Sequence, residues 1–503
     1  MDKKDICNMK SYAGNIIKPG IIRHLALYLT VIIIPALTVV LPLSAQQPQE
    51  TSFGMAASGL PANCTTAGYM QDGDEVIQIG KTYSSTNEGV VESGVCVTNG
   101  GWLTLINPKI TKKGGKQGGQ YAGMGVEASE ASVVNLLNAE IYTDTYGGNG
   151  LWATNEGSSI YMRGGSITAI ANAGHGIVTT ERASVILYDV DISTSGDNAC
   201  GALVNDAGDG TIYAKRVRAR TKGPGSPGFY MIGTMSMLTI MDSTIEAETS
   251  DIGVLLNGSN VAVTDSTLIG GKGVKISGGI FTMTGGSLTS TASDAFYVGG
   301  ADGPDRGIPG GGMLAGMGGA PGGDPGVDPG GGSPPGGPPG GGAPGGDAPP
   351  VEAPGAVTGD FRPQQESSDI TVNDGVKISA SSGNIVNVAE ALKANFTADG
   401  TDLTGDMIVS EGGELTVTLT NSTLTGTVNG AAVILDNKSK WYVTGDSVLT
   451  GLSNRGGISG KTITNIYGNG HTVYYDKKLS GNKALGGKSY TLNGGGSLKP
   501  AKR

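Results

Sequence analysis

Blocks of similar sequence follow one another between residues 132 and 298, and each block begins with a short apolar run. Five of them start as Ser132-Val-Val, Ser158-Ser-Ile, Ser184-Val-Ile, Gly210-Thr-Ile and Ser236-Met-Leu, at a spacing of 26 residues. Shorter blocks follow from Ser259 and Gly279. A fixed period of this size indicates a repeat protein, in which one unit cannot bury its apolar face without its neighbours.

Aligning the blocks places apolar residues in three series. The first series reads Val134, Ile160, Ile186, Ile212, Leu238, Val261 and Phe281. The second reads Ile141, Ile167, Ile192, Ile245, Leu268 and Leu288, with Arg218-Ala219 in the fourth block. The third follows Gly150, Gly176, Gly228, Gly253 and Gly273, with Leu151, Ile177, Val254 and Val274. Alternating β-branched residues between Gly- and Asn-rich turns are typical of strands. Three short strands per repeat predict an all-β fold, a right-handed parallel β-helix (solenoid) with like residues stacked inside.

The first 45 residues read as a signal peptide. Basic residues precede an apolar run over residues 25–43, and small residues place the cleavage site between Ala45 and Gln46. An uncleaved membrane anchor is the alternative, because the run is long enough to span a bilayer. Pro35 and Pro42 disfavour a regular spanning helix. Membrane association is therefore expected only through this segment, if it is uncleaved.

The chain is acidic, with a net charge of −10 over 503 residues. Removing residues 1–45 leaves 29 basic and 42 acidic residues, a net charge of −13. Such a charge argues against nucleic acid or an anionic membrane as a partner. The unusually long segment before the apolar run resembles the extended signals of some large secreted proteins of Gram-negative bacteria, so we expect a secreted or outer cell-surface location.

The repeats divide the rest of the chain. We expect residues 46–131 to form the N-terminal cap and first coils, residues 132–298 the β-helix repeats, and residues 368–503 the C-terminal coils and cap. Residues 299–367 are Gly/Pro-rich without a strict Gly-X-Y period, and they have too few apolar residues to fold. We expect them to be a disordered loop leaving one continuous solenoid. A linker between two independent β-helices is the alternative.

The four cysteines suggest one crosslink. Cys7 would leave with the signal peptide, whereas Cys64 and Cys96 could form a disulfide in an oxidising compartment. Cys200 lies within a repeat, where a small buried residue is expected. No Cys or His cluster has the spacing of a metal site, so no metal or cofactor is expected.

A family resemblance appears near the C-terminus, where residues 432–452 read Ala-Val-Ile-Leu-Asp-Asn-Lys-Ser-Lys-Trp-Tyr-Val-Thr-Gly-Asp-Ser-Val-Leu-Thr-Gly-Leu. This segment resembles the last coils of autotransporter passenger domains, the pertactin-like group of the pectin-lyase-like β-helices. The resemblance implies structural roles for five residues: Trp441, Thr444, Gly445, Ser447 and Leu449. That family continues into a membrane barrel of alternating strands, and no such series follows here. We therefore expect another route of export, or a resemblance to the β-helix alone.

Enzymes of this fold cleave acidic polysaccharides, so two catalytic patterns need testing. Gly174-His175-Gly176 resembles one element of polygalacturonases, but the paired carboxylates that supply acid and base are missing. His175 shares its slot with Asn149, Pro227, Ile252 and Lys272, so we expect an ordinary turn residue.

Polysaccharide lyases supply the second pattern, in which Asp residues bind Ca²⁺ and a basic residue removes a proton. Candidate acids and bases cluster here as Asp189, Asp191, Asp197, Asp206, Asp209, Arg216, Arg218 and Arg220. Asp189 and Asp191 are predicted to point the same way on one strand, with Asp197 in a turn. Surface charge is the simpler interpretation.

These patterns favour a non-catalytic protein with an adhesin-like or structural display role. Its partner would be a glycan or a host or cell-surface ligand. The alternative is a glycan-binding or polysaccharide-cleaving protein, which a row of exposed aromatic residues on one face would favour. The candidates for such a row are Tyr142, Tyr146, Trp152 and Tyr161, and Trp152 is the first to mutate.

Overall fold

The computed structural model describes residues 67–86, 92–114, 123–197, 201–206, 209–300, 367–454 and 456–501. All of them belong to one compact unit, Pro61–Arg503. Strands make up 61% of the structure and helix 2%, which confirms the all-β class. The predicted signal peptide, with Ala45 and Gln46, lies outside the described residues, as does Cys64.

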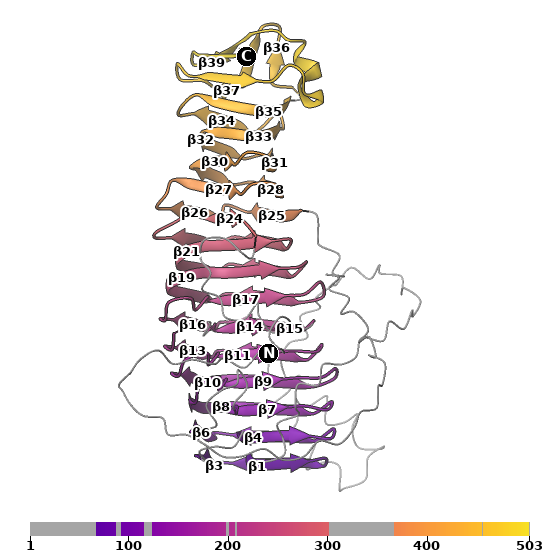
Figure 1. Ribbon diagram of the computed structural model, residues 1–503, viewed down its shortest axis with the longest axis vertical. Coiled ribbons are helices and arrows are strands. Elements are labelled where there is room, and N and C mark those ends of the chain that lie inside the picture. The colour runs from indigo at the N-terminus through magenta and orange to yellow at the C-terminus, as the bar shows by residue number, and fades with distance from the viewer. Residues whose placement is uncertain are drawn as a thin grey trace, which may run out of the picture. The chain divides into compact units, whose positions relative to one another are not determined.

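Three ladders of parallel strands organise the unit, and Figure 1 shows their strands stacked one above another. Strands in the interior of the stack pair with the equivalent strands of the repeats before and after them, as β12 does with β10 and β15. We call one strand from each ladder, taken in sequence order, a coil. This arrangement is compatible with a β-solenoid.

The first ladder contains the strand that opens each repeat. Its members are β2 (Glu75–Ile79), β5 (Trp102–Ile106), β8 (Val133–Asp144), β10 (Ser159–Ala169), β12 (Ser184–Tyr188), β15 (Thr211–Lys215), β18 (Met237–Met241), β20 (Asn260–Thr264), β22 (Ile280–Thr284), β25 (Ser368–Asn373), β28 (Lys393–Asp399), β31 (Glu414–Thr420), β33 (Val428–Leu435) and β35 (Ser447–Asn454).

The second ladder follows after one turn and uses the second halves of β8 and β10. Its other members up to the C-terminal coils are β3 (Thr82–Ser85), β6 (Lys109–Lys113), β13 (Asp191–Thr194), β16 (Arg218–Thr221), β19 (Thr244–Leu256), β21 (Thr267–Ser277), β23 (Ser287–Ser290) and β26 (Lys377–Ala380). A further run contains β29 (Asp402–Thr404), β32 (Thr423–Gly426), β34 (Lys440–Val443) and β37 (Thr462–Tyr467).

The third ladder closes each coil and includes the ends of β19 and β21 and the starts of β33 and β35. Its other members are β1 (Ala67–Asp72), β4 (Ser93–Thr98), β7 (Val126–Ala128), β9 (Leu151–Ala153), β11 (Ile177–Thr179), β14 (Leu203–Asn205), β17 (Phe229–Ile232), β24 (Phe296–Val298), β27 (Asn384–Val388), β30 (Asp406–Val409), β38 (Thr472–Tyr475) and β40 (Ser497–Pro500).

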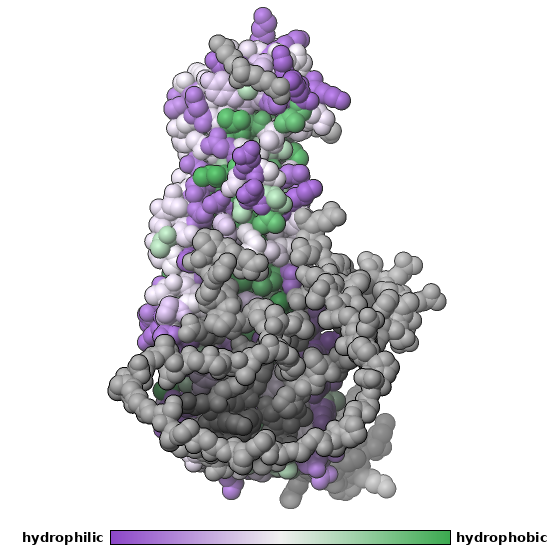
Figure 2. All heavy atoms as spheres, viewed as in Figure 1, coloured by the Kyte–Doolittle hydropathy of each residue, from purple (hydrophilic) through white to green (hydrophobic). Residues whose placement is uncertain are grey.

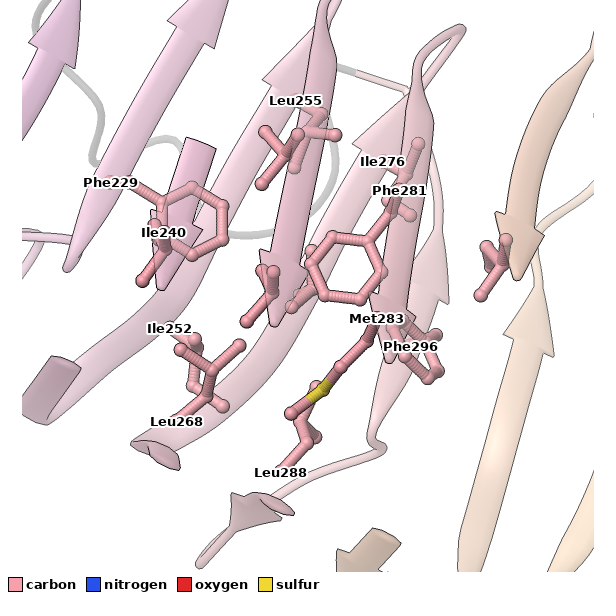
Figure 3. Packing of buried hydrophobic residues seen from close by; sticks show 14 of the residues in the cluster. Phe229, Ile240, Ile252, Leu255, Leu268, Ile276, Phe281, Met283, Leu288 and Phe296 are labelled. Atoms are coloured by element: carbon pink, nitrogen blue, oxygen red, sulfur yellow. The ribbon is translucent and has the colours of Figure 1, made fainter. Parts of the chain in front are cut away.

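The core lies between the ladders and is built from the alternate residues that face inward. In β12, Val185 and Leu187 are fully buried, while Ser184, Ile186 and Tyr188 between them are partly exposed. Successive strands of a ladder place apolar residues in register, as Ile160, Val185 and Ile212 are. Figure 3 shows Phe229, Phe281 and Phe296 among the apolar side chains packed in this interior. A period of two in each strand therefore produces one continuous apolar interior.

A repeated turn joins the first ladder to the second. The residue that follows each first-ladder segment has a positive φ, between 47° and 67°, in twelve successive coils. In β8 and β10 this residue lies within the strand, between its first-ladder and second-ladder halves. These residues are Gly80, Asn107, Asn138, Gly164, Asp189, Arg216, Asp242, Asp265, Gly285, Asp374, Gly400 and Asn421. Gly, Asn and Asp tolerate this left-handed conformation best, so Arg216 is the exception. We call this set the left-handed column.

The structure corrects two positions in the sequence alignment. Val185, not Ile186, pairs with Ile160 and Ile212, so Ile186 faces outward. The two spacings around β12 are 25 and 27 residues rather than 26, because Ser159 pairs with Ser184 and Ser184 with Thr211. In the third series Gly253 pairs with Phe229 and not with Gly228. The Phe229 ring lies where a side chain at Gly253 would be, which explains the glycine.

The strands on the two sides of the Gly/Pro-rich insertion pair directly. β22 pairs with β25, β23 with β26 and β24 with β27, so the ladders continue across it. Asp294, before β24, accepts hydrogen bonds from Ser382, Asn384 and Asn387 at 2.7–2.8 Å. Residues 301–366 themselves lie outside the described residues.

The C-terminal end has a different construction. Antiparallel pairing joins β36 (Ile458–Ser459) to β37, and β39 (Tyr490–Asn493) to β40. The 3-10 helix η1 (Ser480–Leu485) packs beside β35, and the Asn482 side chain donates to the carbonyls of Thr450 and Asp476. These elements cover the last strands of the ladders, as expected for a cap.

Candidate functional site

Three tyrosines form a row on the outer face of the first ladder. Tyr161 of β10, Tyr188 of β12 and Tyr213 of β15 come from consecutive coils and are each half-buried. The ring centroids of Tyr161 and Tyr188 are 5.8 Å apart, and those of Tyr188 and Tyr213 are 5.5 Å apart. We call these residues the tyrosine row. Alternation places them outside, because Leu187, Ile160 and Ile212 face the core.

The environment keeps the hydroxyls of Tyr161 and Tyr188 neutral. Burial raises the pKa of Tyr161, and burial followed by the neighbouring Tyr213 raises that of Tyr188. The Tyr213 hydroxyl donates to the sulfur of Met241 at 3.3 Å. Partly apolar rings with polar tips are suited to bind a partner that offers both surfaces.

Arg163 lies beside the tyrosine row and differs from the other arginines. Its register partner in the next coil is Tyr188. Among the arginines within the described ranges, the four others are ion-paired with carboxylates of neighbouring coils. They are Arg182, Arg216, Arg218 and Arg220. No such pair forms at Arg163 within the described part of the chain, and its side chain is exposed. Its guanidinium can therefore bind an external acceptor.

Two of the predicted acids are held by arginines of the next coil. Asp189 accepts bonds from Arg216 at 2.6 and 2.9 Å, and Asp191 accepts bonds from Arg218 at 2.8 and 3.1 Å. The hydrogen bonds from Arg216 lower the pKa of Asp189. Such bidentate pairs orient both carboxylates toward their arginine partners. This geometry is unsuited to a general acid.

The predicted placement of Asp189 was wrong. Asp189 belongs to the left-handed column in the turn before β13, with φ of 58°, and Asp191 is the first residue of β13. The off-by-one register at β12 caused the error, since it assigned the strand one residue too far along the chain.

The remaining acids do not complete a site with this pair. The backbone N–H of Asp197 donates to Asn172 at 3.0 Å, in the predicted turn. Asp206 is buried after β14, and Asp209 accepts a bond from the N–H of Met235 at 2.9 Å. Within the described residues, no group of three or more His, Cys, Asp and Glu side chains is arranged to hold a metal ion.

His175 is held in a turn before β11. Its backbone N–H donates to Asn149 Oδ1 at 2.9 Å, and Asn149 occupies the equivalent position one coil earlier. Burial lowers the pKa of the imidazole to about 4, so it is neutral at pH 7. Its slot in later coils holds Gly201, Pro227, Asp251 and Lys272, so the predicted Ile252 is replaced by Asp251.

The predicted aromatic candidates do not form one row. Trp152 is only 1% exposed and its Nε1–H donates to Thr180 Oγ1 at 3.1 Å. Tyr146 is 49% exposed, and Tyr142 lies under the ammonium of Lys113 at 5.3 Å. Only Tyr161 belongs to the tyrosine row. Tyr188 was missed because the uniform period placed Ile186, and therefore Tyr188, on the inside. Tyr213 was overlooked, although the correct inward placement of Ile212 implied that it faces outward.

The segment that resembles passenger domains contributes to the core. Trp441, Ser447 and Leu449 are at most 1% exposed, and the Trp441 Nε1–H donates to the Gly426 carbonyl at 3.0 Å. Ser447 Oγ accepts the N–H of Val428 from the preceding coil at 3.3 Å. Thr444 is exposed and Gly445 is partly buried.

Cys96 of β4 is disulfide-bonded and fully buried. The other cysteines, Cys7, Cys64 and Cys200, lie outside the described residues, so the pairing with Cys64 stays a prediction. In the described ranges, η1 is the one helical segment, and its six residues fall far short of a membrane-spanning helix.

Comparisons with known proteins add no relative. A scan against protein-family models gives no match, and a search of curated proteins finds none either.

Proposed function

We propose that the chain is a secreted or outer-surface right-handed parallel β-helix that acts by binding, in an adhesin-like or display role without catalysis. The observation that carries the proposal is the contrast on its outer face. The tyrosine row and Arg163 offer contacts to a partner, whereas Asp189 and Asp191 are held in ion pairs.

Export through residues 1–45, with cleavage between Ala45 and Gln46, is part of the proposal. The disulfide at Cys96 supports it, because disulfides persist in oxidising compartments and are rare in the cytosol. The resemblance of residues 432–452 to passenger domains, with Trp441 in the core, supports the same surface role.

Glycan binding is the second candidate, and the tyrosine row favours it. Tyrosine rings stack on the apolar faces of sugars, and Arg163 can donate to hydroxyl or carboxylate oxygens. Polysaccharide cleavage has weaker support, because the pairs Asp189–Arg216 and Asp191–Arg218 leave neither carboxylate positioned as an acid.

The test combines location with binding. The full chain is expressed with its own leader in a Gram-negative host, and protease accessibility on intact cells reports its location. The purified protein is then titrated with polygalacturonate, alginate and xylan, with and without Ca²⁺, while unsaturated products and reducing ends are assayed.

We expect surface-accessible protein and no turnover. Saturable polysaccharide binding that Tyr188→Ala weakens at least about tenfold supports the glycan alternative. The matched control is Tyr442→Ala, from the stacked pair Tyr442 and Tyr467, whose centroids are 4.5 Å apart. Product formation that Asp189→Asn abolishes would overturn the non-catalytic proposal. Protein confined to the cytoplasm would overturn the surface role.

A further inference from the structure

Cys96 lies near the N-terminal end of the third ladder. The chain has only three other cysteines with which it could form a disulfide. β4 pairs with β1 on one side and β7 on the other, and Cys96 is opposite Met70 and Glu127. Its disulfide must involve Cys7, Cys64, Cys200 or a second copy of the chain.

The number of coils between Cys96 and Cys200 places them too far apart to form a disulfide. The strand that follows Cys200 is β14, and the third ladder reaches it from β4 through β7, β9 and β11. Four strand spacings amount to about 19 Å. Cys200 is bonded to Gly201, which shortens the separation by no more than about 4 Å. A disulfide requires Cα atoms within about 7 Å.

Cys64 has the necessary reach. It precedes the first residue of β1, Ala67, by three positions, and Ala67 precedes Met70 by three. Ala67 therefore lies about 11 Å from Cys96, and three residues span up to about 10 Å. This length of chain is sufficient for Cys64 to come within disulfide range of Cys96.

We propose that Cys64 and Cys96 form a disulfide that locks the N-terminal coil onto the second coil. Excluding Cys7 rests on the proposed export, because removal of residues 1–45 takes Cys7 away. The bond forms as the two thiols lose two protons and two electrons. An oxidised dithiol protein of the extracytoplasmic compartment accepts them by thiol–disulfide exchange and becomes a dithiol.

The lock acts where the ladders have a free end. Within the described residues β1, β2 and β3 each pair on one side only, with β4, β5 and β6. Met70, Ile77 and Ile79 of this coil are 44–64% exposed. Such a terminal coil opens more easily than an interior one. Closing the chain between Cys64 and Cys96 restricts the opened state.

Peptide mapping tests the linkage. Full-length chain with its leader is isolated from the oxidising compartment, alkylated without reduction, digested and analysed by mass spectrometry. We expect a Cys64–Cys96 peptide and alkylated Cys200. Linkage of Cys96 to Cys7, to Cys200 or to Cys96 of a second copy overturns the proposal, as does alkylated Cys96.

Hydrogen exchange tests the lock. In Cys64→Ser, exchange in β1, β2 and β3 is expected to rise at least about tenfold, with β20 and β22 unchanged. Cys200→Ser is the matched control and should match the parent protein. Unchanged exchange in Cys64→Ser overturns the lock even if the linkage is found. Export is read separately, so reduced Cys96 in exported protein refutes the disulfide while leaving the proposed surface location intact.

Discussion

The outer face of the first ladder differs between its N-terminal coils and the coils that adjoin and follow the insertion. From β10 to β15 it carries the tyrosine row, with Arg163 beside it. From β22 to β31 one outward position is threonine in four consecutive coils, where Thr282, Thr371, Thr397 and Thr418 pair in register. Figure 2 shows hydrophilic and neutral residues, with a few hydrophobic ones, on the visible side of the C-terminal coils.

The inner face does not change in this way. Ile160, Val185 and Ile212 continue through Phe281 and Ile370 to Phe396, all at most 1% exposed. The ladders therefore depend on what faces inward and on the left-handed column. The outward positions are free to differ between regions, and this is where a binding function can be placed without altering the fold.

The largest expected difference is between the effects on stability of substituting an inward-facing residue and its outward-facing neighbour in the same strand. Phe396→Ala removes a fully buried ring that lies 6.2 Å from Phe296, and should lower the free energy of unfolding by about 3–5 kcal/mol. Thr397→Ala, one residue further, should change it by less than about 0.5 kcal/mol. Urea unfolding of both variants measures the difference. Equal losses would contradict the division between inner and outer faces.

The buried imidazole of His175 should make the N-terminal coils sensitive to acid. Its pKa is about 4 when folded, against about 6.5 when unfolded, so the unfolded chain binds the extra proton first. This contribution to stability is complete above about pH 6.5 and is lost as the pH falls toward 4. The loss at pH 4.5 should be about 2 kcal/mol.

His175→Asn, which copies Asn149 of the preceding coil, should remove this pH dependence and leave that of the carboxylates. Urea midpoints of the two proteins at pH 7 and pH 4.5 provide the measurement. Parallel pH profiles would show that His175 titrates normally in the folded state.

Deleting residues 301–366 tests whether the two regions form one stack. The deletion joins β24 to β25 through Gly299, Gly300 and Ser367, comparable to the two residues between β21 and β22. A shorter loop should stabilise the protein by about 1–2 kcal/mol. Thermal unfolding with circular dichroism reports both stability and strand content. Loss of the β-sheet signal would refute direct pairing of β22 with β25.

The smallest effects should come from the turn between the ladders. Arg216→Asn loses an exposed ion pair but places a tolerant residue in the left-handed column, so stability should change by less than about 0.5 kcal/mol. Arg216→Val loses the same pair and adds strain, for a loss of about 1 kcal/mol. Urea unfolding separates the two. Equal losses would mean that the ion pair, and not the turn, determines stability here.

The sequence predicts most of the inner face because inward positions repeat at nearly constant spacing. The second series was right at every quoted position, including Ala219 in the fourth block. The first series was wrong only at Ile186. The spacings of 25 and 27 residues on the two sides of β12 add up to two regular periods, so the shift of one residue is not visible in the other repeats. A local signal existed, since Val185 and Leu187 precede Asp189, a residue suited to the left-handed turn.

The candidate site was harder to predict than the fold. Tyr161, Tyr188 and Tyr213 are adjacent only when the register of three coils is known to one residue, because a shift by one moves a side chain to the opposite face. The ion pairs that hold Asp189 and Asp191 depend on the same register. The glycine at position 253 is explained by the position of the Phe229 ring, and the repeat period in the sequence does not predict where that ring lies.

The left-handed column also has a consequence for how such a protein could change in size. Its backbone N–H groups donate to a carbonyl of the following coil, as Asn107 does to Leu137, Asp189 to Lys215 and Asp265 to Thr284. The same connection thus recurs whatever side chain the turn carries. If the gene segment that encodes one coil were duplicated, the added coil could form the same hydrogen bonds with the coil before it and the coil after it. Length in this lineage can therefore grow in increments of one strand spacing, about 4.8 Å, while each new coil begins with an outer face open to selection.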